Sequence, residues 1–188
     1  MSTVRILALV GSLRAGSHNR QLAEAAVALA PEGVEIEIYE GLADIPFYNE
    51  DIDTPSGVPA SAVRFRDAAE RSDAFLLFSP EYNGTIPAVL KNAIDWASRP
   101  MGSGVFVGKP LAVVGTAYGQ YGGVWAQDEA RKSAGIAGAA VLADVQLSVA
   151  ESVIRFAERH PSQDAEITEK LAVVVQQVAD AAKQPVAA

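Results

Sequence analysis

The chain has 188 residues, a length that suits one α/β domain, and its 15 Lys and Arg against 23 Asp and Glu give a net charge of −8. Because acidic residues outnumber basic ones, we expect no extended basic surface that would attract nucleic acid or an anionic membrane. A bound anion would have to be held by a few local groups. The sequence contains no cysteine, which excludes thiolate catalysis and disulfides and means that redox chemistry would need a bound cofactor.

Apolar strand-length runs alternate with segments of helical periodicity along the whole chain. Each run is followed by a loop rich in glycine, proline or small polar residues. The predicted elements are a strand over Thr3–Val10, a helix over Asn19–Leu29, a strand over Val34–Tyr39, a helix over Ala60–Arg71, a strand over Ala74–Phe78, a helix from Ile86 that stops at Arg99-Pro100 with Pro87 in its first turn, a strand over Leu111–Val114, a helix over Val124–Ala134, a strand over Ala139–Val145 and a helix over Ala165–Ala182.

Five strands alternating with five helices, without an internal repeat, predict an α/β fold with a parallel sheet covered by helices on both faces. Five strands favour the flavodoxin-like, doubly wound order 2-1-3-4-5. We expect a single domain over residues 1–183 and a frayed tail over 184–188. In this order a ligand binds at the carboxyl ends of the first and third strands.

The apolar run Ile6–Leu13 could also be the core of a signal peptide, with Arg5 before it and small residues after it. The run is short, its basic flank is thin, and cleavage would remove the glycine-rich loop. No other stretch reaches the ~20 apolar residues of a membrane span. We therefore expect a cytoplasmic protein without a membrane partner.

The loop after the first strand, GSLRAGSHN at residues 11–19, has the composition of an anion cradle. Its glycines let backbone N–H groups converge, Ser12, Ser17 and Asn19 add hydrogen-bonding side chains, and Arg14 adds charge. The N-terminus of the following helix contributes its dipole. The loop is neither a G-x-G-x-x-G nor a Walker A motif. The alternative is a tight turn that only caps the helix.

Two further loops would meet the first at the same edge of the sheet. The second, residues 79–85, follows the most apolar strand, and its Gly84 would allow close approach of a flat group. A turn with a helix cap at Thr85 would explain only part of this loop. The third, GTAYGQYGG, begins at Gly115 and is again built of small residues, with Tyr118 and Tyr121. Three such loops suit a planar cofactor with a phosphate tail.

Together, GSLRAGSHNRQL, PEYNGTIPAVLKNAIDW and GTAYGQYGG resemble the NADPH-dependent FMN reductase family, flavodoxin-like enzymes that include quinone, chromate and azo-dye reductases. The similarity spans about residues 4–145. It implies FMN as the bound cofactor and NADPH or NADH as the reductant. The implied cofactor-binding residues are Ser12, Arg14, Ser17 and Asn19 for the phosphate, Pro80, Glu81, Tyr82, Asn83 and Gly84 for the isoalloxazine, and Thr116 and Gly119 in the third loop.

The third loop departs from the family, since Thr116, Ala117 and Tyr118 stand where many relatives carry Ser and Pro. This leaves the open face of the flavin, and hence the electron acceptor, undefined. Quinones, flavins, chromate and azo compounds are all candidates. The resemblance implies a ping-pong mechanism in which the flavin takes two electrons from NAD(P)H and passes them to the acceptor. No catalytic side chain is needed.

Other features predict no separate chemistry. His18 and His160 have no further ligands around them in the sequence, so we expect surface histidines and no metal site. Two alternatives to the reductase are a flavodoxin-type electron carrier, whose phosphate loop usually lacks arginine, and a nucleotide-binding module without turnover.

Trp96 lies at the flank of the apolar face of its predicted helix, where a monomer would leave it partly exposed. Contiguous apolar surface of this kind marks interfaces. We therefore expect a homodimer, or a tetramer of paired dimers, built on this helix. The helix that begins near Trp125 is the alternative interface.

Overall fold

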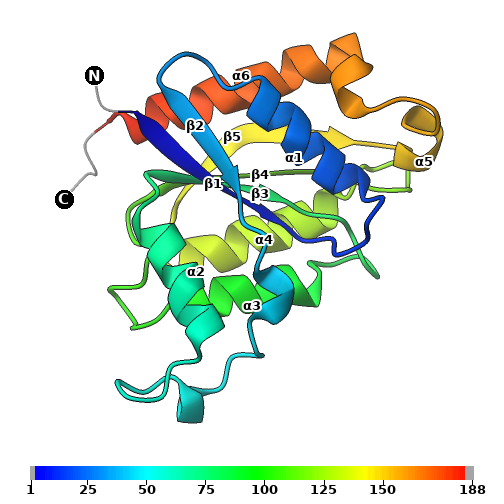
Figure 1. Ribbon diagram of the computed structural model, residues 1–188. Coiled ribbons are helices and arrows are strands. Elements are labelled where there is room, and N and C mark those ends of the chain that lie inside the picture. The colour runs from blue at the N-terminus through cyan, green and yellow to red at the C-terminus, as the bar shows by residue number, and fades with distance from the viewer. Residues whose placement is uncertain (1–2, 185–188) are drawn as a thin grey trace.

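The computed structural model describes residues 3–184, which form one five-stranded parallel sheet between two layers of helices (Figure 1). The strand order is β2-β1-β3-β4-β5, which confirms the predicted doubly wound fold. The strands are β1 (Val4–Val10), β2 (Val34–Ile38), β3 (Ala74–Phe78), β4 (Pro110–Thr116) and β5 (Ala140–Val149).

Two long helices cover one face of the sheet and three cover the other (Figure 1). The first layer is α1 (His18–Ala28) and α6 (Ala165–Ala182), and the second is α2 (Ala60–Glu70), α3 (Ala88–Ala97) and α4 (Val124–Ile136). Four short turns of helix complete the described chain: η1 (Leu42–Asp44), η2 (Glu50–Ile52), α5 (Ser152–Arg155) and η3 (Pro161–Gln163).

The central strands are apolar on both sides because each side faces its own helix layer. In β3, Leu76 and Phe78 belong to the core against α1 and α6, whereas Phe75 and Leu77 belong to the core against α2, α3 and α4. This burial explains why β3 reads as a continuous apolar run. The polar loops that follow such strands therefore stand out in the sequence.

Helix boundaries agree with the predicted ones to within about two residues, the usual spread of such assignments. The prediction for Pro87 is wrong, since this residue is the N-cap of α3 rather than part of its first turn. The two last strands are longer than predicted. β5 is an edge strand that continues past Val145 with only Leu147 and Val149 buried, and its pairing with β4 carries Thr116 into the sheet.

The Trp96 side chain is fully buried, so the expected partial exposure is wrong. Its indole Nε1 donates a hydrogen bond to the Pro46 carbonyl at 2.8 Å, and the Arg66 guanidinium lies 5.0 Å from the ring centroid. The segment after β2 thus covers the flank of α3. Trp96 therefore offers no exposed apolar surface to a second subunit.

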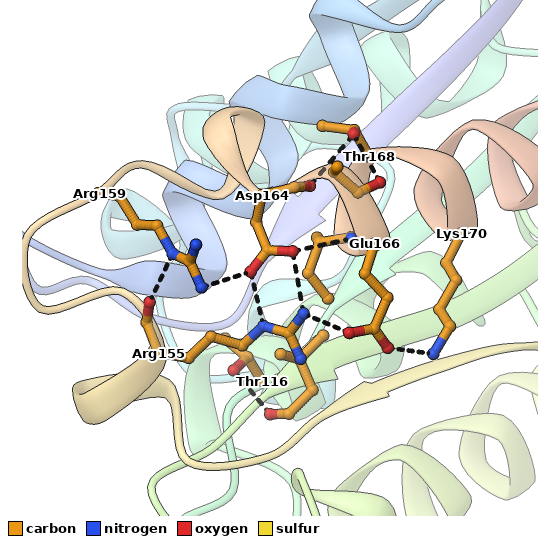
Figure 2. Close-up of polar contacts among 10 residues, drawn as sticks. Thr116, Arg155, Arg159, Asp164, Glu166, Thr168 and Lys170 are labelled. Atoms are coloured by element: carbon orange, nitrogen blue, oxygen red, sulfur yellow. Dashed lines mark hydrogen bonds and ion pairs between the residues drawn. The ribbon is translucent and has the colours of Figure 1, made fainter.

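The connection from β5 to α6 is held by an ion-pair cluster of Arg155, Arg159, Asp164, Glu166 and Lys170, called the Asp164 cluster below (Figure 2). Arg155 binds Asp164 through two nitrogens, at 2.8 and 2.9 Å, and reaches Glu166 at 2.7 Å. Asp164 is also the N-cap of α6. The hydrogen bonds from Arg155, with further help from the α6 backbone, lower the Asp164 pKa to about 2.

Most of the predicted tail, residues 184–188, lies outside the described residues. None of the helices in the described part of the chain combines the length and the apolar character that a membrane span needs.

Candidate functional site

The first and second loops lie against each other at the carboxyl ends of β1 and β3. The Gly11 N–H donates to the Phe78 carbonyl at 2.9 Å. A Cβ atom at Gly11 would stand 2.8 Å from Cγ of Pro87 and 3.1 Å from Cδ of Pro80. A side chain at Gly11 would therefore push the second loop away. The structure brings together the two loops that the sequence placed at the switch point.

Ser12 and Arg14 have the solvent-accessible polar side chains of the first loop. The Ser12 hydroxyl lies 3.4 Å from the Tyr82 hydroxyl of the second loop. Arg14 is exposed, and one of its guanidinium nitrogens lies 3.1 Å from where a Cβ of Gly16 would be, so the charge is folded back over the loop. Within residues 3–184 no carboxylate comes within 4.0 Å of Arg14. The loop thus presents a cation that is free to bind an anion.

Ser17 closes the first loop and begins α1. Its side chain is 2% exposed, and its hydroxyl accepts from the Arg20 N–H at 3.3 Å as the N-cap of the helix. The Ser17 N–H donates to the Arg14 carbonyl at 3.0 Å, which closes the turn. The capping role considered as an alternative therefore holds for Ser17, and it leaves Ser12 and Arg14 unexplained.

Asn19 and Thr116 are used internally, which the sequence did not indicate. Asn19 is 4% exposed; its Nδ2 donates to the Thr116 carbonyl at 2.8 Å and its Oδ1 accepts from the Thr116 N–H at 3.0 Å. The Thr116 hydroxyl donates to the Val149 carbonyl at 2.7 Å. These bonds tie α1 to the ends of β4 and β5. Neither side chain is displayed at the surface of the crevice.

The second loop turns on two residues with positive φ, Asn83 at 54° and Gly84 at 76°. Tyr82 and Thr85 exchange both backbone hydrogen bonds at 3.2 Å across this turn. A two-residue turn of this kind favours the Asn-Gly pair because both positions need left-handed backbone. The turn places Tyr82, 49% exposed, above the first loop, while Pro80 is buried at the base.

The third loop, residues 117–123, is tied to β5 and α5. Backbone hydrogen bonds join the Ala117 N–H to the Val149 carbonyl and the Glu151 N–H to the Gly119 carbonyl. Gly119 itself is exposed. Tyr118 is 77% exposed, and the ring of Tyr121 lies 5.2 Å from that of Trp125. The loop is therefore fixed at its base and aromatic at its surface.

A largely apolar cavity of about 600 Å³ opens beside the first and second loops. Arg14 is the charged side chain at its wall. Asn92, which also lines the cavity, already binds the backbone of residues 45, 46 and 48. The other principal walls are Leu13, Phe47, Tyr82, Pro87 and Val89.

The two histidines take structural positions. His18 packs edge-on against Phe156 at 5.7 Å, and burial, together with the charge of Arg14, lowers its pKa. His160 caps η3. In residues 3–184 there is no group of three or more His, Asp or Glu side chains that could hold a metal ion.

This donor set suits the phosphate of a flavin nucleotide. It offers an unpaired guanidinium, a hydroxyl, and the capped N-terminus of α1, next to a loop edge with little side-chain bulk. The arrangement defines a flavodoxin-like α/β protein whose switch-point loop has the donor groups that could hold an anion. The chain matches the family model for NADPH-dependent FMN reductase over residues 4–153.

Similar proteins and a similar solved structure support the match to this family. The chain is 46% identical over 128 residues to a quinone reductase of Pseudomonas putida, covering 68% of each chain. It is 42% identical over 130 residues to an NAD(P)H-dependent FMN reductase of Pseudomonas aeruginosa, covering 69% of each. The solved structure of FerB, a flavoenzyme NAD(P)H:(acceptor) oxidoreductase from Paracoccus denitrificans, superimposes with a TM-score of 0.85 at 31% identity, covering 96% of this chain and 98% of that one.

The chain therefore belongs to the NADPH-dependent FMN reductase family. It is an oxidoreductase with FMN as cofactor and NAD(P)H as reductant.

Proposed function

We propose that this enzyme transfers two electrons from NAD(P)H to quinones by a ping-pong mechanism. The observation that carries the proposal is the unpaired Arg14 at the junction of the first loop and an apolar cavity of about 600 Å³. Several curated relatives, including the one from Pseudomonas putida, are named quinone reductases. The acceptor is a small molecule, and the quinone is the class that we propose.

The first loop would hold the FMN phosphate. Arg14 supplies the charge, Ser12 a hydroxyl, and Ser17 the start of α1. A charge-assisted hydrogen bond contributes roughly 1.5–3 kcal/mol, so Arg14 would dominate the recognition of the phosphate. Asn19, which the resemblance also assigns to the phosphate, would act by holding the loop to Thr116.

The second and third loops would hold the isoalloxazine. Pro80, Tyr82, Asn83 and Gly84 would line one edge of the ring, and Gly119, which is exposed in the third loop, would line another. The bound FMN would supply the centre that accepts a hydride and then donates two electrons. The side chains need only bind and orient the flavin and its substrates, and none acts as an acid or a base.

The apolar cavity would receive the ring of the acceptor. Its lining of Leu13, Phe47, Pro87 and Val89 favours a planar apolar molecule, and Arg14 at the wall favours one that carries an oxygen with partial negative charge. A single open site of this kind is consistent with NAD(P)H leaving before the acceptor enters. Chromate, azo compounds and free flavins remain alternative acceptors for the same site.

We further propose a homodimer in the cytoplasm, with a dimer of dimers as the larger alternative. Trp96 is buried, so the support now comes from other exposed apolar side chains on the same layer: Met101 at 83%, Ile136 at 81% and Trp125 at 53%. Met101 and Ile136 border a cavity of about 480 Å³ between α3 and α4. Light scattering should give twice the 19.7 kDa chain mass or more, and a clean monomer would contradict the proposal.

The direct test is kinetic. FMN-loaded enzyme under argon should lose its flavin absorbance when NADPH is added and regain it when a benzoquinone is added. Initial rates should give parallel double-reciprocal lines as both substrates are varied. Intersecting lines would contradict the ping-pong order. Failure of NADPH to reduce the flavin would contradict the reductase and favour an electron carrier or a binding module.

A further inference from the structure

The first turn of α4 is hydrogen-bonded to both loops of the flavin crevice. Glu81 in the second loop accepts from the Ala126 N–H at 3.2 Å. Gln127 on the same turn donates from Nε2 to the carbonyl of Gly122 in the third loop, also at 3.2 Å. One helical turn therefore connects two loops that follow different strands.

Gln127 is held in a single orientation. It is fully buried, and its Oε1 accepts from the Ser148 hydroxyl at 3.0 Å and from the Arg131 guanidinium at 3.3 Å. The same Arg131 nitrogen donates to the Val113 carbonyl at 2.9 Å. A buried amide with both oxygen lone pairs occupied cannot rotate without leaving several groups unpaired.

Glu81, in the second loop, caps the N-terminus of α4. The N-cap of α4 is Gly123, which has no side chain to bind the first N–H groups. The carboxylate of Glu81 takes one of these groups and places a negative charge at the positive end of the helix. The side chain of Glu81 is therefore directed to α4, although its motif assigns it to the flavin.

The second and third loops are in close contact at the start of α4. A Cβ atom at Gly123 would lie 3.4 Å from Cβ of Ala117 and 3.5 Å from Cβ of Glu81, and one at Gly122 would lie 2.8 Å from the backbone of Ser148. The loops thus pack closely at the start of α4. The hydrogen bonds of Glu81 and Gln127 join the two loops at this same point.

We propose that Glu81 and Gln127 are positioning residues that fix the second and third loops at one spacing and so set the width of the flavin crevice. This inference rests on the proposed binding of the isoalloxazine between these loops. Tyr118 and Tyr121 are exposed on the third loop, so a shift of that loop would move the aromatic surface offered to the acceptor.

The test uses variants that remove hydrogen bonds with little change of volume. Gln127→Met fills the same space without the amide, Glu81→Ala removes the carboxylate, and Glu81→Gln retains an acceptor for the Ala126 N–H. Gln177→Met on the exposed side of α6 is the matched control.

The first readout needs no cofactor. In apoprotein, amide hydrogen exchange across residues 117–127 should become roughly tenfold faster in Gln127→Met and in Glu81→Ala, because each loses a hydrogen bond of ordinary strength. Glu81→Gln and Gln177→Met should exchange as the unaltered protein does. Unchanged exchange in both loop variants would overturn the proposal.

The second readout uses FMN and a benzoquinone. Gln127→Met and Glu81→Ala should raise the dissociation constant of FMN and the KM for the quinone roughly tenfold, with kcat changed less than about twofold. Lower thermal stability with unchanged FMN affinity and KM would reduce the network to a structural role and overturn the proposal. If the unaltered protein failed to bind FMN, the proposed function would fail, while the exchange experiment would still test the loop spacing.

Discussion

The first loop and the Asp164 cluster both lie beyond the carboxyl ends of strands and both contain arginine, yet they use it in opposite ways. Arg155 contacts two carboxylates at 2.9 Å or less (Figure 2). Arg14 has no carboxylate within 4.0 Å in the described chain. The paired arginine closes a junction of the fold, and the unpaired one leaves a charge for a ligand.

Burial shows the same contrast. Asp164 is 4% exposed and accepts hydrogen bonds from Arg155 and from the Ile167 N–H, so its charge is compensated inside the protein. Among residues 3–184 the Ser12 hydroxyl has one hydrogen-bond partner from a side chain, the Tyr82 hydroxyl, at the long distance of 3.4 Å. We therefore expect the Asp164 cluster to contribute to stability, whereas the first loop is the region that we propose for binding. Substitutions in the two regions should separate these effects.

The largest expected effect on stability is at Arg155. Arg155→Met leaves the buried Asp164 with Arg159 as its remaining charged partner among the described residues, and breaking a buried ion pair costs about 3 kcal/mol or more. Denaturant unfolding should show a loss of this order in the free energy of unfolding. Arg155→Lys should lose less, since it keeps the charge without the paired geometry. A loss below about 1 kcal/mol for Arg155→Met would place the cluster among ordinary surface pairs.

The second effect is pH dependence at Asp164. Its pKa falls from 3.8 in the unfolded chain to about 2 in the fold, so its contribution is fully present above the unfolded value and is lost as the pH falls through the folded value. The shift corresponds to about 2 kcal/mol. The stability advantage of the unaltered protein over Asp164→Asn should therefore shrink by more than about 1 kcal/mol between about pH 7 and about pH 2.5. An advantage independent of pH would contradict this assignment.

The smallest effect is expected at the rim of the same cluster. Lys170 pairs with Glu166 at 2.6 Å, but both side chains are more than half exposed. Exposed pairs spaced four residues apart on a helix contribute about 0.3–0.5 kcal/mol. Lys170→Ala should change the free energy of unfolding by no more than this amount. A loss as large as that of Arg155→Met would show that the whole cluster acts as one unit.

The sheet, its strand order and the meeting of the first two loops could be predicted because they follow from the sequence pattern. Buried strands such as Ala74–Phe78 are continuous apolar runs, and polar loops at their ends interrupt the pattern sharply. Five such strands restrict the topology to a few orders. The asparagine-glycine pair at positions 83 and 84 is typical of the two-residue turn found there.

The internal uses of Asn19, Glu81 and Thr116 could not be predicted from the sequence. Each binds a backbone group of a segment distant in the chain, and no local pattern marks such a partner. The prediction that Trp96 is partly exposed failed for the same reason. The loop that covers it, at Pro46, lies fifty positions earlier in the chain. Periodicity shows which face of a helix is apolar, but it does not show what covers the flank.

The most direct test of the contrast between the two regions is the affinity of apoprotein for FMN and for riboflavin, which lacks the phosphate, in the unaltered chain and in Arg14→Ala. Because Arg14 is unpaired, its loss should leave the free energy of unfolding within about 0.5 kcal/mol of the original. The affinity for FMN should fall about tenfold to a hundredfold, and the affinity for riboflavin should change little. Equal weakening of both ligands, or a large loss of stability without loss of FMN affinity, would contradict the assignment of Arg14 to the phosphate.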